Sequence, residues 1–305
     1  MNRTAFIFPG QGAQYCGMGR DFYETFETAK EVYETAAQAT GLDVAGLCFE
    51  EDERLNITEY TQIAMLTTEV AILKVLQENG VKADICAGLS LGEYGALAAA
   101  EVMELPDLFR LIRSRGIFMQ EAYPTGGAMT AVLGLDAETI RAVCEGTEGI
   151  VSIANDNCPG QIVITGEESA VLAATQKLNE AGAKRCVPLK VSGPFHSRLL
   201  AGAGEKLAAE LAGIEVSEPK IPYISNVQAD YVRSAEPVKE LLARQVSGTV
   251  RWRETMERML ADGVDTFIEI GPGKTLAGFL RKMSREAKVI NIETVENLKA
   301  FLEKR

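Results

Sequence analysis

A serine between two glycines marks a sharp strand-to-helix turn in the first third of this chain. Residues 88–92 read Gly-Leu-Ser-Leu-Gly, with Ser90 at the centre. The mostly apolar run 83–87 predicts a buried strand, and the Ala- and Leu-rich run 93–100 predicts a helix. A strand that turns directly into a helix exposes the central serine beside free backbone N–H groups. This segment therefore favours an α/β fold with a nucleophile elbow, the alternative being an ordinary tight turn.

The chain of 305 residues contains one histidine, His196. A serine hydroxyl is a weak nucleophile until an adjacent base takes its proton. If Ser90 is a nucleophile with an imidazole base, that base must be His196. The alternative for His196 is a loop histidine at a domain boundary.

Composition excludes several classes of function. The formal net charge of −12 disfavours nucleic acid and anionic membranes as partners. No two of the six cysteines lie within four residues of each other, so no zinc or redox Cys pair is expected. The chain has no signal-peptide pattern and no apolar run of 18 residues. We expect a cytoplasmic protein, and a monomer by default.

Two glycine-rich segments resemble nucleotide-binding loops and fail the full pattern. The segment 10–12 follows a predicted strand, but Tyr15 stands where a dinucleotide fingerprint has its third glycine. The segment 271–275 resembles a phosphate-binding loop, but Ile268 replaces its first glycine. Neither predicts a bound nucleotide cofactor.

The middle of the chain carries its own pattern of elements. Within 126–195 the order is strand, helix, strand, strand, helix, strand, with expected bounds 128–134, 137–145, 150–155, 161–165, 168–181 and 184–191. This βαββαβ order predicts a ferredoxin-like subdomain, bracketed by glycines at 126–127 and by Ser-Gly-Pro at 192–194. Strands and helices alternate in 1–125 and 196–305, which predicts one α/β core with a mainly parallel sheet.

Four segments together resemble a known family. They are Phe-Pro-Gly-Gln-Gly at 8–12, Gly-Leu-Ser-Leu-Gly-Glu-Tyr at 88–94, Arg-Gly-Ile-Phe-Met-Gln-Glu-Ala at 115–122 and Gly-Pro-Phe-His-Ser at 193–197. In this order and spacing, the chain resembles malonyl-CoA:acyl-carrier-protein transacylases along essentially its whole length. The resemblance implies an α/β-hydrolase-like core with an inserted ferredoxin-like subdomain.

The resemblance also implies a reaction, which belongs to fatty-acid synthesis. Ser90 would attack the thioester of malonyl-CoA, and the malonyl group would then pass to the phosphopantetheine thiol of acyl carrier protein. His196 would take the serine proton and return one to the leaving thiol. Malonyl-CoA is then a substrate, and neither a tightly bound cofactor nor a metal is expected.

Further residues receive roles from the same resemblance. The backbone N–H groups of Gln11 and Leu91 would form the oxyanion hole, and the carbonyl of Gln245 would orient His196. No acid lies where an ordinary triad has one, so the site is expected to be a Ser–His dyad.

Two residues are expected to choose the acyl group. Arg115 would hold the malonyl carboxylate with its guanidinium. The alternative is a surface arginine paired with a nearby acid, as expected for Arg110 and Arg113 on the same helix. Phe195 would exclude methylmalonyl groups by its bulk, or it is simply a core aromatic residue.

The chain departs from the family pattern at Leu89, Ile63 and Cys158, where histidine, proline and serine are usual. Three alternatives remain: a discrete acyltransferase of a polyketide synthase, a serine esterase or thioesterase, and a non-catalytic scaffold that binds acyl carrier protein. Because acyl carrier proteins are acidic, docking is expected on local basic groups, namely Lys184, Arg185, Lys190 and Arg198.

Overall fold

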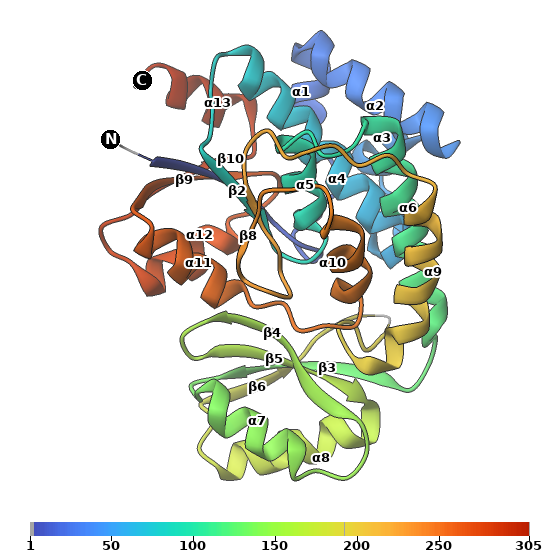
Figure 1. Cartoon of the computed structure of the whole chain (residues 1–305), viewed down its shortest axis with the longest axis vertical. Coiled ribbons are helices and arrows are strands. Elements are labelled where there is room, and N and C mark those ends of the chain that lie inside the picture. The colour runs from blue at the N-terminus through green and yellow to red at the C-terminus, as the bar shows by residue number, and fades with distance from the viewer. Residues whose placement is uncertain (1–2, 192, 305) are drawn as a thin grey trace.

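The computed structural model describes residues 3–191 and 193–304, and it contains two separate β-sheets (Figure 1). The larger sheet has the strand order β10-β9-β1-β2-β7-β8, and the smaller has the order β4-β5-β3-β6. Ser192, at the expected exit from the subdomain, lies outside the described residues.

The larger sheet is parallel except at one edge. Its strands are β1 (Arg3–Phe8), β2 (Ile85–Gly88), β7 (Tyr223–Ile224), β8 (Tyr231–Val232), β9 (Val264–Ile270) and β10 (Lys288–Ile292). Only β7 and β8 pair antiparallel. Alternate residues of β1 enter two different hydrophobic clusters, Ala5 and Ile7 on one face, Phe6 and Phe8 on the other. The predicted α/β class with a mainly parallel sheet is therefore confirmed.

Helices cover both faces of this sheet. They are α1 (Arg20–Thr25), α2 (Glu27–Thr40), α3 (Val44–Phe49), α4 (Thr58–Glu78), α5 (Gly92–Ala99), α6 (Leu105–Ala122), α9 (Ala201–Ala212), α10 (Val238–Gln245), α11 (Trp252–Ala261), α12 (Thr275–Met283) and α13 (Val295–Leu302), with short 3-10 turns at Glu53–Asn56 and Arg198–Leu200. The cluster behind Ala5 and Ile7 contains residues of α11 and α12. The opposite cluster contains residues of α4, α5 and α6.

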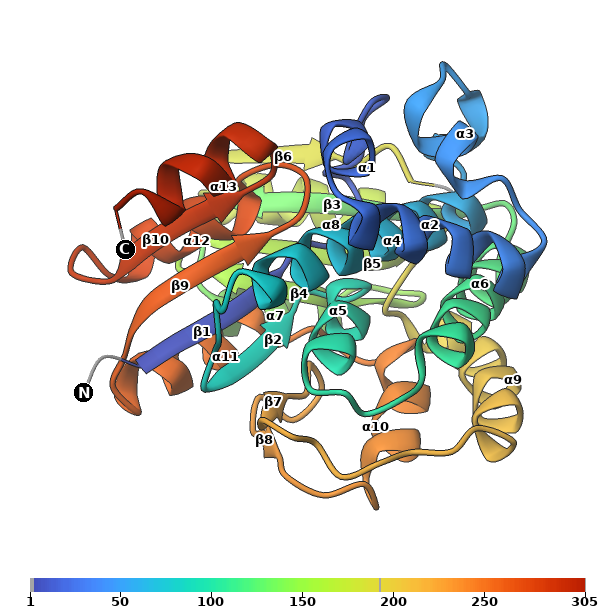
Figure 2. The same cartoon turned by 90° about the horizontal axis from the view of Figure 1, so that it is seen from above.

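Helix α6 packs between α4 and α9 along one flank of the molecule (Figure 2). The helix α4 is buried on nearly every side, because most of its residues are apolar or small. This packing carries the inward side of α6 toward the carboxyl end of β2, which is where the predicted site lies.

The smaller sheet has the predicted βαββαβ order. It consists of β3 (Gly127–Leu133), α7 (Ala137–Glu145), β4 (Val151–Cys158), β5 (Gln161–Glu167), α8 (Glu168–Glu180) and β6 (Arg185–Pro188). All its strand pairs are antiparallel, and α7 and α8 cover the face away from the larger sheet (Figure 1). The last strand ends at Pro188, earlier than the expected 191, and β4 continues beyond 155 to Cys158. The domain limits at 126 and 195 remain a prediction.

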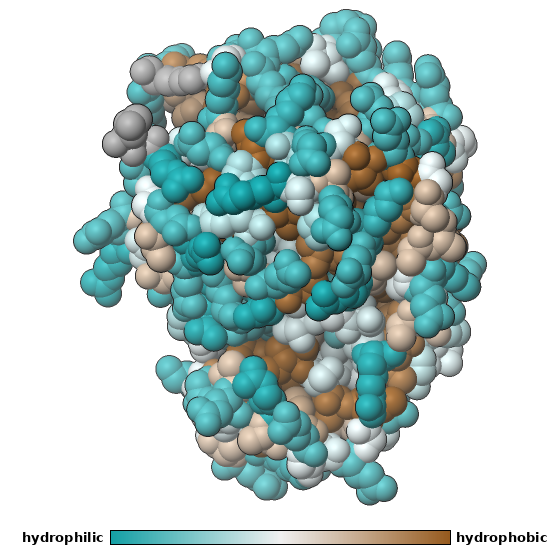
Figure 3. Space-filling model, in the orientation of Figure 1, coloured by the Kyte–Doolittle hydropathy of each residue, from teal (hydrophilic) through white to brown (hydrophobic). Residues whose placement is uncertain are grey.

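The two bodies are joined through β4. The backbone N–H of Val250 donates to the Ala154 carbonyl, and the N–H of Asp156 donates to the Val250 carbonyl. Hydrophobic side chains gather on the surface where the bodies meet (Figure 3). Among residues 3–191 and 193–304, no helix combines the length and the apolar character needed to cross a membrane.

Candidate active site

The elbow between β2 and α5 leaves no room for side chains at its two glycines. A Cβ atom on Gly88 would lie 1.8 Å from the Gly92 carbonyl oxygen, and one on Gly92 would lie 2.2 Å from that of Phe8. Ser90, between them, has a φ of 54°, in the left-handed region that few non-glycine residues adopt. The elbow thus presents Ser90 at the carboxyl edge of the sheet, where open α/β sheets bind their ligands.

Ser90 and His196 are hydrogen-bonded. The Ser90 Oγ lies 2.7 Å from the His196 Nε2, and the His196 Nδ1 lies 2.9 Å from the Gln245 carbonyl oxygen. A carbonyl only accepts, so Nδ1 carries the proton and Nε2 is free to accept from the serine hydroxyl. Burial, and then the charge of Arg115, lower the pKa of His196 to about 4. The imidazole is therefore neutral at pH 7 and can act as a base.

Arg115 is buried beside this pair. Its guanidinium donates to the side-chain oxygens of Gln62 at 2.7 Å and Gln245 at 2.9 Å, and it lies 3.3 Å from the Ser90 Oγ. Its Nε has no hydrogen-bond partner among the described residues. In the part of the chain that the structure describes, no carboxylate lies within ion-pair distance of it. It is a desolvated cation whose direct partners are neutral, which is a suitable receptor for an anionic substrate group.

The two other arginines of α6 are less buried than Arg115, and each pairs with a carboxylate. Arg110 pairs with Asp107 on its own helix, and Arg113 pairs with Glu59 at 2.8 Å. The structure therefore separates Arg115 from its neighbours by burial and by the absence of a carboxylate partner.

The predicted oxyanion donors also lie at the site. Gln11 follows β1 and Leu91 follows Ser90, and both line the same cavity as the serine. Neither backbone N–H donates a hydrogen bond to another described residue. The side chain of Gln11 donates to the Thr58 hydroxyl at 3.2 Å, which holds the loop against α4. Two free N–H groups beside a nucleophile can stabilise an oxyanion.

The cavity has a volume of about 190 Å³ and draws its walls from both bodies. The larger body contributes Leu89 and Phe279, the smaller sheet contributes Asn155 and Asn157, and Phe195 comes from the segment that joins the two. Phe195 is 6% exposed, so it is both a wall of the cavity and part of the core. Its predicted role in acyl choice stays a prediction.

Asn226 fixes the elbow, although no sequence motif marked it as a site residue. Its side-chain oxygen accepts from the Ser90 backbone N–H at 2.7 Å, and its amide donates to the Gly88 carbonyl at 2.7 Å. Asn226 follows β7, which is parallel to β2, and the carboxyl ends of neighbouring parallel strands meet at one edge. An amide side chain two residues beyond that strand was the signal that could have found it.

Glu93 and the side chain of Gln245 were also missed. The Gln245 amide nitrogen donates to the Ser90 carbonyl and to a Glu93 oxygen, both at 2.8 Å. The same Glu93 oxygen accepts from the Asn226 N–H at 3.1 Å. Sequence analysis gave Gln245 a role only through its backbone carbonyl, whereas its side chain joins the serine turn, Arg115 and Glu93.

The family departures leave the site's polar groups intact. Leu89 is partly buried and lines the cavity, Ile63 lies in the core of α4, and Cys158 is fully buried at the end of β4. The four basic residues expected at a docking surface, Lys184, Arg185, Lys190 and Arg198, are all exposed.

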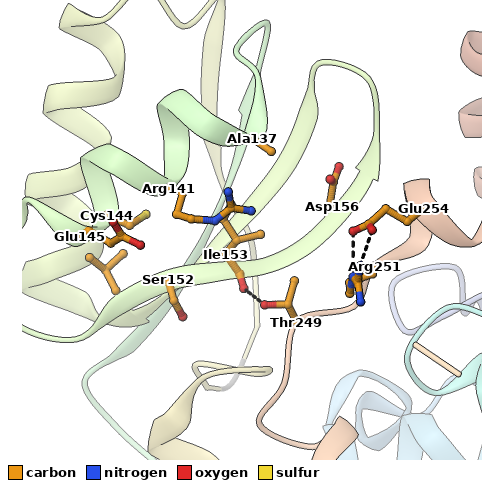
Figure 4. A pocket seen from close by; sticks show the side chains of 11 residues that line it. Ala137, Arg141, Cys144, Glu145, Ser152, Ile153, Asp156, Thr249, Arg251 and Glu254 are labelled. Carbon is orange, nitrogen blue, oxygen red and sulfur yellow. Dashed lines mark hydrogen bonds and ion pairs between the residues drawn. The ribbon is translucent and has the colours of Figure 1, made fainter. Parts of the chain in front are cut away.

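A second cavity, of about 360 Å³, lies on the other side of β4 (Figure 4). Successive residues of a strand point to opposite faces, so Asp156 lines this cavity while Asn155 and Asn157 line the first. Its residues Arg251 and Glu254 form an ion pair, drawn dashed in Figure 4. None of the predicted site residues lines it.

An elbow serine bonded to a neutral histidine, at the carboxyl edge of a parallel sheet, is the arrangement of a serine-nucleophile enzyme of the α/β class. Comparison with known proteins shows which family of serine-nucleophile enzymes this is. The chain belongs to the acyl transferase family, because the model of the acyl transferase domain matches residues 5–299. It is an acyltransferase.

Three similar proteins with names are all malonyl transacylases. The chain is 44% identical to the malonyl CoA-acyl carrier protein transacylase of Bacillus subtilis, over 99% of this chain and 97% of that protein. A transacylase of the same name from Clostridium perfringens has a crystal structure that matches at a TM-score of 0.96 and 43% identity, over 99% of this chain and 96% of that one. A malonyl-transacylase solved with a type II polyketide synthase acyl-carrier protein matches at 0.96 and 40% identity, over the whole of both chains.

Proposed function

We propose that this acyltransferase moves a malonyl group from malonyl-CoA to the phosphopantetheine thiol of acyl carrier protein, in fatty-acid synthesis. The observation that carries the substrate choice is Arg115, a buried guanidinium without a carboxylate partner, 3.3 Å from the Ser90 hydroxyl oxygen. A malonyl thioester has a free carboxylate three carbons from its sulfur, and an acetyl thioester has none. Ionic recognition of that carboxylate would set the carbonyl carbon beside Ser90.

The first half of the reaction forms a malonyl-serine ester. The Ser90 Oγ attacks the thioester carbonyl carbon while its proton moves to the His196 Nε2. The tetrahedral oxyanion faces the N–H groups of Gln11 and Leu91. The carbon–sulfur bond then breaks, and His196 gives its proton to the coenzyme A thiolate.

The second half reverses these steps with a different thiol. The phosphopantetheine thiol gives its proton to His196, and the thiolate attacks the ester carbonyl. The ester bond to Ser90 breaks, and the serine oxygen recovers the proton from His196. The Gln245 carbonyl accepts from Nδ1–H, so that nitrogen keeps its proton and only Nε2 gains and loses one.

A serine esterase or thioesterase is the less supported alternative. The described partner of the His196 Nδ1 is a neutral carbonyl and not the carboxylate of a hydrolase triad. A discrete polyketide acyltransferase would share every residue of this site, and only the carrier protein separates the two.

Mass spectrometry of the intact protein after brief mixing with malonyl-CoA tests the proposal. We expect one malonyl adduct on the wild type, its loss on addition of phosphopantetheinylated acyl carrier protein, and no adduct on Ser90→Ala. Release of free coenzyme A without an adduct would indicate a hydrolase. If no adduct forms and no coenzyme A is released, malonyl-CoA is not the substrate.

The basic residues Lys184, Arg185, Lys190 and Arg198 are proposed to dock the acidic carrier. Reversing Arg185 and Lys190 to glutamate should raise the KM for acyl carrier protein about tenfold or more at low salt, with less effect on the KM for malonyl-CoA. Reversing Arg285 and Lys288, two exposed residues at β10 of the larger sheet, to glutamate is the matched control. An unchanged KM in the double variant would place the docking surface elsewhere.

We also place the reaction in the cytoplasm. All six cysteines are free thiols in the structure, which suits a reducing compartment.

A further inference from the structure

Glu93 is a fully buried carboxylate on the first turn of α5, three residues after the nucleophile. One of its oxygens accepts two hydrogen bonds, from the Asn226 N–H and the Gln245 amide. Its other oxygen is buried, with no hydrogen-bond partner in residues 3–191 and 193–304. The proposed mechanism uses no proton from Glu93, yet the hydrogen bonds from Asn226 and Gln245 hold its carboxylate in the site.

Gln245 connects Glu93 to Arg115. The amide nitrogen of Gln245 donates to Glu93 at 2.8 Å, and its oxygen accepts from Arg115 at 2.9 Å. The buried anion and the buried cation are thus held apart by one neutral amide. In a water-excluded site, two opposite charges separated by one amide group stabilise each other. An anion that binds Arg115 weakens the stabilisation that Arg115 gives to the Glu93 carboxylate.

We infer that Glu93 is the internal counter-charge of Arg115 and takes up a proton when a carboxylate-bearing acyl group binds. This inference rests on the proposed function, in which Arg115 receives the malonyl carboxylate. The incoming anion neutralises Arg115 and leaves Glu93 as an unpaired negative charge in a dry environment. Protonation at the unpartnered oxygen removes that charge and keeps both hydrogen bonds to the other oxygen. Glu93 is a positioning residue, because it acts on the substrate through Gln245 and Arg115.

The pKa of Glu93 allows it to take up a proton near neutral pH. Burial raises the pKa of Glu93 to about 7, while the bonds from Asn226 and Gln245 and the charge of Arg115 act to lower it. Because the pKa of Glu93 lies near neutral pH, a negative charge added nearby raises that pKa and causes the carboxylate to bind a proton. Above pH 7, malonyl binding must therefore be accompanied by proton uptake, whereas an acetyl thioester requires none.

Other groups near Glu93 do not replace it at pH 8. Burial raises the pKa of Tyr94 and of Tyr223 far above that pH, and burial lowers that of His196 to about 4. On α4, Glu69 lies against Gly95 and interacts electrostatically with Glu269, and its pKa is raised well above the usual range. Among the described residues, the charged or titratable groups that interact electrostatically with Glu93 are Arg115 of α6, Tyr94 of α5 and Tyr223 of β7.

Calorimetry in buffers of different ionisation enthalpy measures this proton directly. The Ser90→Ala protein is titrated with malonyl-CoA and with acetyl-CoA, which carry the same titratable phosphates. At pH 8 we expect malonyl-CoA to take up about one proton more than acetyl-CoA, and at pH 6 the difference should be close to zero. The Ser90→Ala/Glu93→Gln double variant should show no difference at either pH.

Kinetics supply a second readout. The wild-type KM for malonyl-CoA should rise up to about tenfold per pH unit above pH 7, while that for acetyl-CoA stays nearly flat. Glu93→Gln, whose amide oxygen can accept the same two bonds, should give a malonyl KM independent of pH. Glu121→Gln removes an exposed carboxylate from α6 and so controls for the change in net charge. In this variant the KM for malonyl-CoA should depend on pH as in the wild type.

Two results would overturn the inference in distinguishable ways. Equal proton uptake for both thioesters at pH 8, with malonyl binding still weakened selectively by Arg115→Ala, would remove the role of Glu93 and leave the proposed function standing. If Arg115→Ala weakens both thioesters equally, the proposed carboxylate site fails, and the inference fails with it.

Discussion

Ser90 and His196 lie 106 residues apart in sequence, and both hold a left-handed backbone where their side chains meet at 2.7 Å. Their φ values are 54° and 59°. Each such conformation costs about 1–3 kcal/mol for a non-glycine residue, and it persists only where the surrounding structure enforces it. The elbow glycines and Asn226 enforce it at Ser90, and the Gln245 carbonyl holds the imidazole of His196.

Arg115→Ala should separate malonyl from acetyl transfer. Loss of charge-assisted bonds to the malonyl carboxylate should lower kcat/KM for malonyl-CoA about 10²-fold, and that for acetyl-CoA much less. Steady-state assays with both thioesters measure this, with Arg110→Ala as the surface control on the same helix. A parallel loss for both substrates would show that Arg115 supports the site and does not recognise the carboxylate.

The acidic limb of the pH profile should report His196. Burial lowers the pKa of this histidine to about 4, so the imidazole is neutral and active above that pH and protonated below it. For acetyl-CoA, which avoids the Glu93 effect, kcat/KM should fall tenfold per pH unit below pH 4 and be flat from 5 to 8. A limb near pH 6.5 would mean that the imidazole is hydrated in the working enzyme.

Gly92→Ala should prevent a stable elbow. The new Cβ would lie 2.2 Å from the Phe8 carbonyl oxygen, and backbone cannot move aside as a flexible side chain can. We expect a loss of about 3 kcal/mol or more in the free energy of unfolding, measured by urea denaturation. The control is Gly202→Ala in α9, where nothing lies within 4 Å and a gain of about 0.5–1 kcal/mol is expected. Wild-type stability in Gly92→Ala would contradict the geometry of the elbow.

Glu69→Gln should change how stability depends on pH. Both carboxyl oxygens of Glu69 are buried without a partner, and burial raises its pKa well above the usual value. An acid with a raised folded pKa contributes stability that is complete below its unfolded pKa, about 4.3, and is lost as the pH rises toward the folded value. The wild type should therefore lose up to about 1.4 kcal/mol per pH unit more than the variant between pH 5 and 7. Urea denaturation across that range measures the slopes, with the exposed Glu34→Gln as control. Identical slopes would show that Glu69 is solvated.

Local pattern predicted much of this fold. Helical periodicity over 58–78, followed by Asn-Gly as a stop signal, predicts a helix with the two ends that α4 has, Thr58 and Glu78. Helical periodicity over 21–39 predicts one helix, but the structure has two, broken at Phe26, whose extended φ of −122° accompanies ring packing against Phe22. Sequence analysis predicted no element for α13, although Thr294 and Asn297 form its capping box. Asparagine in place of the usual Glu or Gln hid that signal.

The candidate site was predictable only as far as motif and resemblance extend. Ser90 follows from its glycines and His196 from its uniqueness, but spacing could not separate Arg115 from Arg113 on the same helix. Both arginines contact α4, but Arg113 pairs with the carboxylate of Glu59, whereas Arg115 is buried against Gln62 and lies 3.3 Å from the Ser90 Oγ. Asn226 and Glu93 act through contacts more than 130 residues apart in sequence, which no local pattern contains.

Because the protein has one histidine, and that histidine is bonded to Ser90 through one nitrogen and to a carbonyl through the other, its imidazole is a built-in spectroscopic probe. In a sample labelled with nitrogen-15 at histidine, every ring resonance comes from the active site. The two nitrogens should have well-separated chemical shifts, one typical of a protonated nitrogen and one of an unprotonated nitrogen. Acylation of Ser90 removes the hydroxyl proton from one bond only, so the Nε2 signal alone should follow the loading and unloading of the enzyme.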